Sequence, residues 1–195
     1  EEEGRLTYQA ACAAIGTAGA QALVLDLGGG SLELILGDHE ARRVLSFPLG
    51  VSRLSAQVQA GEDRREDHRR VTKLVDDHLG SRVTAGTAGS GPVIAIACGG
   101  TVRALARLAS QQACAGSAVT TATPAALEGK VLADIARALH TDDALVGHFD
   151  SAKQRRRLFL GAVVLHRTLE RCSIDAVTVS PWGLREGLLL AQRGR

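Results

Sequence analysis

The sequence predicts an α/β fold in which short buried strands are joined to amphipathic helices through glycine-containing turns. Hydrophobic residues make up 45% of the 195 residues, aromatic residues only 3%, and methionine is absent. The core must therefore be built from Ala, Val, Leu and Ile. Glycine is frequent, with 22 residues, and proline is rare, with 4. This balance suits packed helices and strands and does not suit a disordered segment.

The first part of the chain predicts one helix followed by three consecutive strands. From Glu2 to about Gly16 the apolar residues recur at helical spacing. Three short, largely apolar runs with tight turns between them are each typical of a strand: Gln21–Asp26, Ser31–Leu36 and Arg43–Phe47. We expect these three strands to form an antiparallel meander.

The rest of the chain predicts two more buried strands and six helices. Val93–Cys98 and Ala176–Ser180 are apolar runs typical of strands covered on both faces. Thr84–Pro92 and Gln111–Thr123 are predicted to be loops. Helical spacing of apolar residues predicts the helices Gly50–Gln59, Arg64–Val83, Thr101–Ser110, Pro124–His140, Ala152–Arg171 and Gly183–Gln192. The pattern indicates one compact unit with a mixed sheet.

Bulk composition excludes several classes of protein. Lys and Arg number 23 against 21 acidic residues, and a net charge of +2 gives no indication of nucleic-acid binding. No apolar run approaches the ~20 residues that a membrane span needs. The acidic start is unlike a signal peptide, so we expect a cytoplasmic protein. We also expect reduced, mostly buried cysteines, because the four are scattered: Cys12, Cys98, Cys114 and Cys172.

The first place that can carry chemistry is the turn after the first predicted strand. Gly28-Gly29-Gly30-Ser31 lets a phosphate approach the backbone, where successive N–H groups can hold it. Asp26 and Glu33 flank this turn, and two carboxylates beside a phosphate site suit Mg²⁺. The alternative is a plain glycine-rich hairpin whose Asp caps the turn.

The second place is Gly99-Gly100-Thr101, between a buried strand and a helix. A helix N-terminus offers free N–H groups and a favourable dipole to an anion. Arg103 and Arg107 follow on the same helix, where they either face that anion or point into water. The alternative role of Thr101 is that of an N-cap.

The third place is Ser180–Gly187, where the only Trp stands between a strand and a helix. For Trp182 itself we expect packing. At the other end of the sequence, Glu2 and Glu3 either complement the dipole of the first helix or activate a water for attack on phosphorus.

Two charged runs are predicted to be solvated surfaces. Glu62–Arg70 fits a solvated helix face on which Glu66 and Arg70 have the spacing of a weak ion pair. The basic run Arg155–Arg157 could guide a long polyanion, but only some of these residues share one face of a helix. We expect it to be solvated as well.

Five short motifs in order give the chain a resemblance to a known family. They are Glu-Glu-Gly-Arg, Asp-Leu-Gly-Gly-Gly-Ser-Leu-Glu, Phe-Pro-Leu-Gly-Val, Gly-Gly-Thr-Val-Arg-Ala-Leu-Ala and Trp-Gly-Leu-Arg-Glu-Gly. Across nearly its whole length the chain resembles the exopolyphosphatase and guanosine pentaphosphate phosphohydrolase (Ppx/GppA) family. The resemblance implies a ribonuclease-H-like lobe of the actin, sugar-kinase and heat-shock-ATPase superfamily. The active site of that family lies between two such lobes.

The resemblance also implies roles for individual residues. It makes Glu3 the catalytic base, with Glu2 as the alternative, and makes Asp26 and Glu33 the carboxylates associated with Mg²⁺. Arg185 and Glu186 match a closing motif with a mainly structural role. The residues that match the two phosphate-binding loops are Gly28, Gly29, Gly30, Ser31, Gly99, Gly100 and Thr101, and we add Arg103 to this phosphate-binding set.

The sequence departs from the family pattern in three places. Leu32 stands where the family usually has Thr or Ser, and Lys153–Arg157 replaces an Arg-Ala-Asp stretch before Gly161. The first lobe of the family, with its own Asp-x-Gly-Ser-Asn loop, would precede Glu1. The sequence opens without Met inside a predicted helix, so we expect that this lobe is missing upstream and that residues 1–195 are the second lobe.

The predicted activity is Mg²⁺-assisted hydrolysis of a terminal phosphoanhydride in polyphosphate or guanosine pentaphosphate. We expect little activity from this lobe alone, because one wall of the cleft is absent. The alternatives are an ATP-dependent kinase of the same superfamily, with an adenosine pocket near Gly99 and Gly100, and a non-catalytic binding lobe. The expected partners are the substrate and the missing lobe, without membrane or nucleic acid, and a homodimer is left open.

Overall fold

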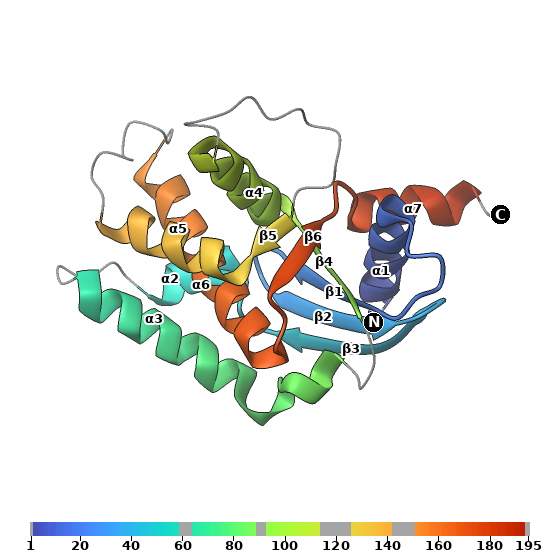
Figure 1. Ribbon diagram of the computed structural model, residues 1–195, viewed down its shortest axis with the longest axis horizontal. Coiled ribbons are helices and arrows are strands. Elements are labelled where there is room, and N and C mark those ends of the chain that lie inside the picture. Colours follow the sequence, from blue (N-terminus) through green and yellow to red (C-terminus); the bar gives the residue numbers. More distant parts are fainter. Residues whose placement is uncertain (1, 59–63, 89–92, 114–125, 142–150, 194–195) are drawn as a thin grey trace.

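A computed structural model describes residues 2–58, 64–88, 93–113, 126–141 and 151–193. Within these ranges six strands form one mixed sheet in the order β3-β2-β1-β4-β6-β5 (Figure 1). The strands are β1 Ala22–Leu27, β2 Leu32–Gly37, β3 Ala41–Phe47, β4 Ile94–Cys98, β5 Ala126–Glu128 and β6 Ala176–Val179. β1, β2 and β3 form the predicted antiparallel meander, while β1, β4 and β6 run parallel.

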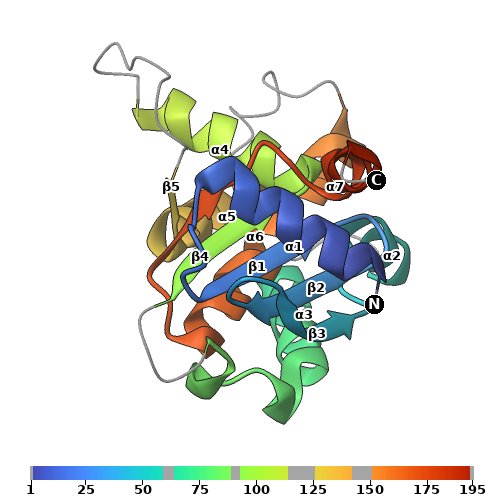
Figure 2. The same ribbon diagram turned by 90° about the vertical axis from the view of Figure 1, so that its right-hand side faces the viewer.

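Helices cover both faces of this sheet. The helices are α1 Glu2–Ile15, α2 Val51–Gln57, α3 Arg64–Leu79, α4 Gly100–Ala113, α5 Gly129–Thr141, α6 Ala152–Cys172 and α7 Leu184–Arg193. α1 lies across β1 to β4 on one face, with α7 beside it (Figures 1 and 2). The other helices pack on the opposite face, with α6 at the centre. The predicted α/β architecture is confirmed.

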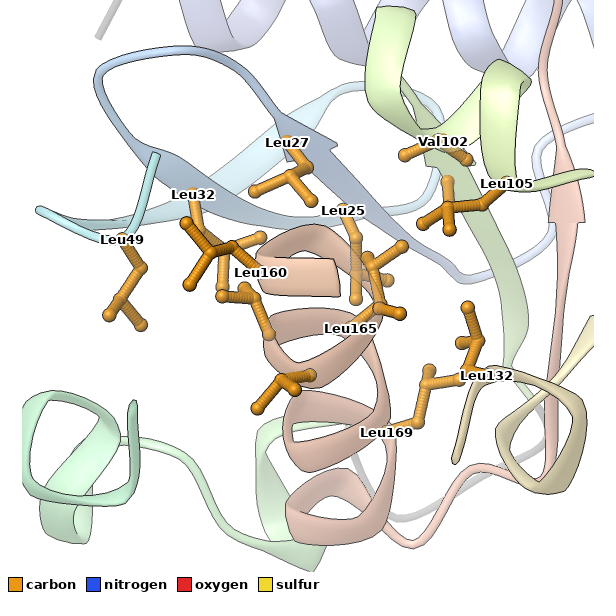
Figure 3. Close-up of a cluster of buried hydrophobic side chains, with 14 of the residues drawn as sticks. Leu25, Leu27, Leu32, Leu49, Val102, Leu105, Leu132, Leu160, Leu165 and Leu169 are labelled. Atoms are coloured by element: carbon orange, nitrogen blue, oxygen red, sulfur yellow. The ribbon is translucent and has the colours of Figure 1, made fainter. Parts of the chain in front are cut away.

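The alternation of side chains along β1 divides the molecule into two cores. Leu23, Leu25 and Leu27 face the larger helical layer, whereas Ala22 and Val24 face α1. Figure 3 shows leucines from β1, β2, α4 and α5 gathered around α6. Both cores consist mostly of Ala, Val, Leu and Ile, as the composition predicts. Full burial of each Leu contributes roughly 1.5–3 kcal/mol.

The first and last helices cross very closely. A Cβ on Gly187 of α7 would overlap the carbonyl of Leu6 in α1. No other residue type fits at this position without moving the two helices apart. The resulting contact fixes α1 against α7 as well as against the sheet.

The structure corrects two predicted helix boundaries. The prediction that Pro124–His140 is a helix is wrong over its first part: Ala126–Glu128 is strand β5, which pairs antiparallel with β6, and α5 begins only at Gly129. Pairing with a strand far along the chain overrides the local helical pattern. The helix predicted from Arg64 ends at Leu79, where Gly80 takes a positive φ of 52°. Thr84–Pro92 and Gln111–Thr123 are only partly described.

The structure corrects the prediction of solvated charged runs at Asp67 and Arg156, although most of the other described residues in these runs are exposed. Arg156 of α6 donates hydrogen bonds to both carboxylate oxygens of Asp67 in α3 and to the carbonyl of Val58. The Asp67 side chain is only 1% exposed and that of Arg156 15%. Arg70 pairs with Asp67. These charges join α6 to α3 inside the fold, because each buried carboxylate needs a counterion.

No helix in the described ranges is long and apolar enough to cross a bilayer. Cys12, Cys98 and Cys172 are free, and the last two are buried. Cys114 lies outside the described residues.

Candidate active site

Three loops meet at one edge of the sheet because the strands before them are parallel. Gly28–Ser31 follows β1, Gly99 follows β4, and Ser180–Gly183 follows β6. A Cβ on Gly99 would lie 2.5 Å from the carbonyl oxygen of Leu27, at the end of β1. The Ser180 N–H donates to the carbonyl of Ala97 in β4 at 2.8 Å. We call this edge of the sheet the carboxyl edge.

A row of three acidic residues lies at the carboxyl edge, on the face that α1 covers. Asp26 and Glu33 are direct partners in the β1–β2 pairing, so their side chains lie on the same face of the sheet. Glu3, in the first turn of α1, is close enough for its charge to raise the pKa of Glu33. Burial is the larger cause of that rise. The structure therefore brings the three predicted carboxyls together.

Asp26 is the most buried member of this row. Burial, followed by the neighbouring charge of Glu33, raises the pKa of Asp26 to about 6. Hydrogen bonding with Cys98 and Thr7 and the charge of Arg103 act in the opposite direction and only partly offset these causes. A carboxylate held next to another carboxylate in a half-dry site attracts a cation.

The first glycine turn is anchored on α2. Its Gly28 N–H donates to the carbonyl of Ser31 at 3.0 Å, which closes the hairpin. The first three N–H groups of α2 donate to the carbonyls of Gly28 and Gly29 at 2.9–3.1 Å. Those helix N–H groups are therefore already used. Gly29 and Gly30 are exposed at the tip of the turn, where an anion can reach their own N–H groups.

Gly50 makes this anchoring possible. A Cβ at Gly50 would overlap the backbone of Gly30 and Ser31. The motif Phe-Pro-Leu-Gly-Val therefore has a structural role beside the turn, which sequence reasoning did not assign to it.

The second glycine turn approaches Asp26 directly. Gly99 has a φ of 113°, which side chains other than hydrogen rarely allow. A Cβ there would also lie 3.4 Å from Oδ1 of Asp26. The alternative role of Thr101 as an N-cap is excluded, because α4 already begins at Gly100. The Thr101 methyl group packs instead against Gly161 of α6.

The third loop is held by hydrogen bonds within itself. The Ser180 Oγ accepts from the Trp182 N–H at 3.1 Å and lies 2.9 Å from the Trp182 carbonyl oxygen. The Gly183 N–H donates to Glu186 at 2.8 Å, which caps α7 and lowers the pKa of that carboxyl. Trp182 is 39% exposed and lies beside Leu189 and Leu190 of α7, so it packs at the surface and not in either core.

Two arginines reach the carboxyl edge from different helices. Arg103 of α4 donates to the carbonyl of Pro181 at 3.2 Å, and its charge acts on Asp26. Arg157 of α6 donates to Ser52 Oγ, which adjoins Gly29. Arg157 is exposed, as predicted for its run, but sequence reasoning did not place it at this edge. The available signal was its position one helical turn before Gly161, a glycine that lets α6 approach the loops.

The donor set at the carboxyl edge fits a hard divalent cation only in part. Asp26 and Glu33 offer carboxylate oxygens that repel each other until a cation lies between or beside them. Among the described residues, no three acidic, His or Cys side chains form a group that could hold a metal alone. Two carboxylates with water and substrate phosphate oxygens suit Mg²⁺, which usually keeps several waters.

Comparison with protein families and with curated sequences agrees on one family. Residues 1–195 match the sequence profile of the Ppx/GppA phosphatase family. "Exopolyphosphatase 1" of Mycobacterium tuberculosis is 37% identical over 196 residues, which cover 97% of this chain and 56% of the relative. "Exopolyphosphatase 1" of Mycobacterium leprae is 36% identical over 201 residues, with the same coverage. The chain thus spans little more than half the length of the curated relatives that it matches.

Solved structures share the fold. The Ppx/GppA enzyme of Aquifex aeolicus superposes with a TM-score of 0.79 at 24% identity, over 98% of this chain and 63% of that one. An exopolyphosphatase from Cytophaga hutchinsonii gives a TM-score of 0.79 at 23% identity, over 97% and 62%. The six-stranded sheet with its flanking helices is therefore the fold that these two solved structures share with this chain.

Proposed function

This chain belongs to the Ppx/GppA phosphatase family, and from that premise we propose that it supplies one lobe of a phosphoanhydride hydrolase. The proposed substrate is inorganic polyphosphate, from which the enzyme removes terminal phosphate; guanosine pentaphosphate is the second candidate. The names of the curated relatives favour polyphosphate. The observation that carries the proposal is the row of Glu3, Asp26 and Glu33 beside two glycine turns.

In this proposal Glu3 is the general base. Its carboxylate orients a water and accepts its proton while the water oxygen attacks the terminal phosphorus. The bond from that phosphorus to the bridging oxygen breaks, and the shortened chain leaves as a phosphate anion. Glu3 suits this role because it is the exposed member of the row, in the first turn of α1.

Asp26 and Glu33 would hold Mg²⁺, which when bound supplies positive charge to offset the charge on the transferring phosphoryl group. The N–H groups of the turns at Gly29 and Gly100 would bind its oxygens. Arg103 and Arg157 add positive charge from opposite sides. Phosphoryl transfer depends mainly on such positioning and charge stabilisation.

We further propose that the site is complete only with a second lobe. The acidic row, the glycine turns and the two arginines at the carboxyl edge would form one wall of the active-site cleft. The curated relatives are almost twice as long as the matched region, which leaves room for a second lobe to form the other wall. The isolated chain should therefore release little phosphate from polyphosphate.

The base assignment is tested by phosphate release from polyphosphate in the two-lobed enzyme. Glu3→Gln should lower kcat by about 10²–10⁴-fold, the usual size of a general-base contribution. Glu2→Gln is the matched control, because Glu2 is equally exposed in the same turn, and it should retain activity. Normal turnover of Glu3→Gln at saturating Mg²⁺ would contradict the assignment. Stabilisation by ATP without any release from polyphosphate would instead favour a kinase.

A further inference from the structure

A second concentration of positive charge lies away from the carboxyl edge, in a cavity between α3, α5 and α6. Its volume is about 480 Å³, within the roughly 300–1,000 Å³ of small-molecule sites. Six of the residues that line it are basic: Arg65, His68, Arg69, Arg137, His166 and Arg167. Among the described residues, none that lines the cavity is acidic.

Neighbouring carboxylates neutralise only part of this charge. Arg167 is paired with Asp76 and Glu170, and Arg137 with Asp134. Arg69 is exposed and has no ion-pair partner in the described part of the chain. Arg69 therefore brings to the cavity a positive charge that no described carboxylate neutralises.

Two lining residues also carry buried polar atoms without a hydrogen-bond partner. These atoms are Oγ1 of Thr72 and Nδ1 of His166, and neither finds a donor or acceptor within the described ranges. An unpaired buried polar group costs about 1–3 kcal/mol. Such groups are rare in folded proteins, and a bound ligand is one of the ways in which they are satisfied.

The cavity and the carboxyl edge are separate places on the same helix. Gly161 of α6 packs at the carboxyl edge, whereas His166 lies in the cavity. Five residues of helix separate their Cα atoms by about 8 Å along the axis. α3 and α5, which form the other walls of the cavity, supply none of the residues placed at the carboxyl edge.

We propose that this cavity is a second binding site, distinct from the candidate active site, for an oligophosphate group. Several guanidinium groups around one opening match the closely spaced charges of such an anion. Ala133, Ala136 and Val163 form a small apolar surface beside the charges. The oligophosphate can belong to an inorganic chain or to a nucleotide, whose base could use that apolar surface.

The test is a titration followed at the histidine rings by NMR on the 195-residue chain. The chain has six histidines, and His68 and His166 are assigned from their Gln variants. Tripolyphosphate and ATP are added separately, without Mg²⁺ and at constant ionic strength. Each should shift the two cavity histidines in a saturable way and leave His39, in the β2–β3 turn, unchanged.

Matched variants decide whether the cavity carries the effect. Arg69→Ser should weaken binding about three- to tenfold, and Lys73→Ser, which removes an exposed charge from the same helix outside the cavity, should not. Thr72→Val should also weaken binding about three- to tenfold, while Thr72→Ser keeps the hydroxyl and should bind normally.

The two ligands distinguish the source of the phosphate. Equal affinities indicate that the phosphates alone are recognised, and tighter binding of ATP indicates that the nucleoside uses the apolar surface; both support the site. The proposal is overturned if His68 and His166 do not shift, or if NaCl shifts them equally. It is also overturned if Arg69→Ser has no effect, or if Arg103→Ser abolishes the shifts, since the ligand would then act from the carboxyl edge.

Discussion

Asp67 is a buried aspartate and Asp26 a partly buried one, and their surroundings are opposite. Asp67 lies between α3 and α6, where the guanidinium of Arg156 donates to both of its oxygens. Asp26 lies at the end of β1, where its direct cross-strand partner is another carboxyl, Glu33. One carboxylate has its counterion built into the fold, and the other has a like charge beside it.

This difference separates a stabilising carboxylate from a functional one. Burial alone does not distinguish the two, because both are largely withdrawn from water. The neighbouring side chain distinguishes the two aspartates. A carboxylate paired with an arginine holds two helices together, whereas a carboxylate that faces a second carboxylate destabilises the fold and attracts a cation or a proton. The predictions below test this contrast.

The largest effect should come from removing the counterion of Asp67. Arg156→Met leaves a buried carboxylate unpaired and should lower the free energy of unfolding by about 3–5 kcal/mol. Arg157→Met, at the exposed neighbouring position, should cost less than about 1 kcal/mol. Urea unfolding of both variants measures these changes. An equal loss of unfolding free energy in the two variants would show that the ion pair of Arg156 with Asp67 does not stabilise the fold.

Removing the charge of Asp26 should instead increase the free energy of unfolding. The folded-state pKa of about 6 lies above the ordinary value of 3.8, so ionisation of Asp26 destabilises the fold above pH 6. Asp26→Asn should therefore raise the free energy of unfolding by about 1–3 kcal/mol at pH 7.5. This gain should shrink as the pH falls through 6 and vanish below 4. A loss of stability at pH 7.5 in Mg²⁺-free buffer would contradict the reading.

Mg²⁺ should offset part of the destabilisation that arises when Asp26 ionises. If it binds with millimolar affinity, 10 mM Mg²⁺ should stabilise the chain by about 1 kcal/mol. Asp26→Asn/Glu33→Gln should abolish this gain, while Arg156→Met should keep it. Thermal unfolding with and without Mg²⁺ measures the effect, and an equal gain in the double variant would exclude a metal at the row.

The smallest effect concerns the coupling between the two carboxyls. Glu33→Gln removes the like charge and should lower the pKa of Asp26, although burial, the larger cause, will keep it above its ordinary value. NMR titration of the Asp26 carboxyl carbon measures this shift. An unchanged pKa would mean that the two side chains do not face each other.

Local sequence predicted the features that depend on neighbours along the chain. The pairing of Asp26 with Glu33 follows from a four-residue turn between two short, largely apolar strands. Each of the three loops is marked in sequence by an apolar strand that ends in small residues, and the loops meet at one edge because these strands are parallel. The position of α1 over Asp26 did not follow, but a single resemblance motif already connected Glu3 with this site.

Features that depend on partners far along the chain could not be predicted from local sequence. Arg156 and Asp67 are 89 residues apart, and in sequence each stands among other charges that truly are exposed. β5 has only three residues and exists because β6 offers it an edge. Arg157 reaches the carboxyl edge only because Gly161 lets α6 pack closely against Thr101, a contact between residues 60 positions apart.

The close crossing of α1 and α7 has a consequence for the order of assembly. Within residues 2–193 the ribosome makes α1 before the sheet, but Gly187, against which α1 packs, is made only after β6. During synthesis α1 therefore cannot make its final contacts until α7 has been made. Glu3 belongs to the first turn of α1, so the final position of this third member of the acidic row depends on a residue of α7, near the opposite end of the sequence.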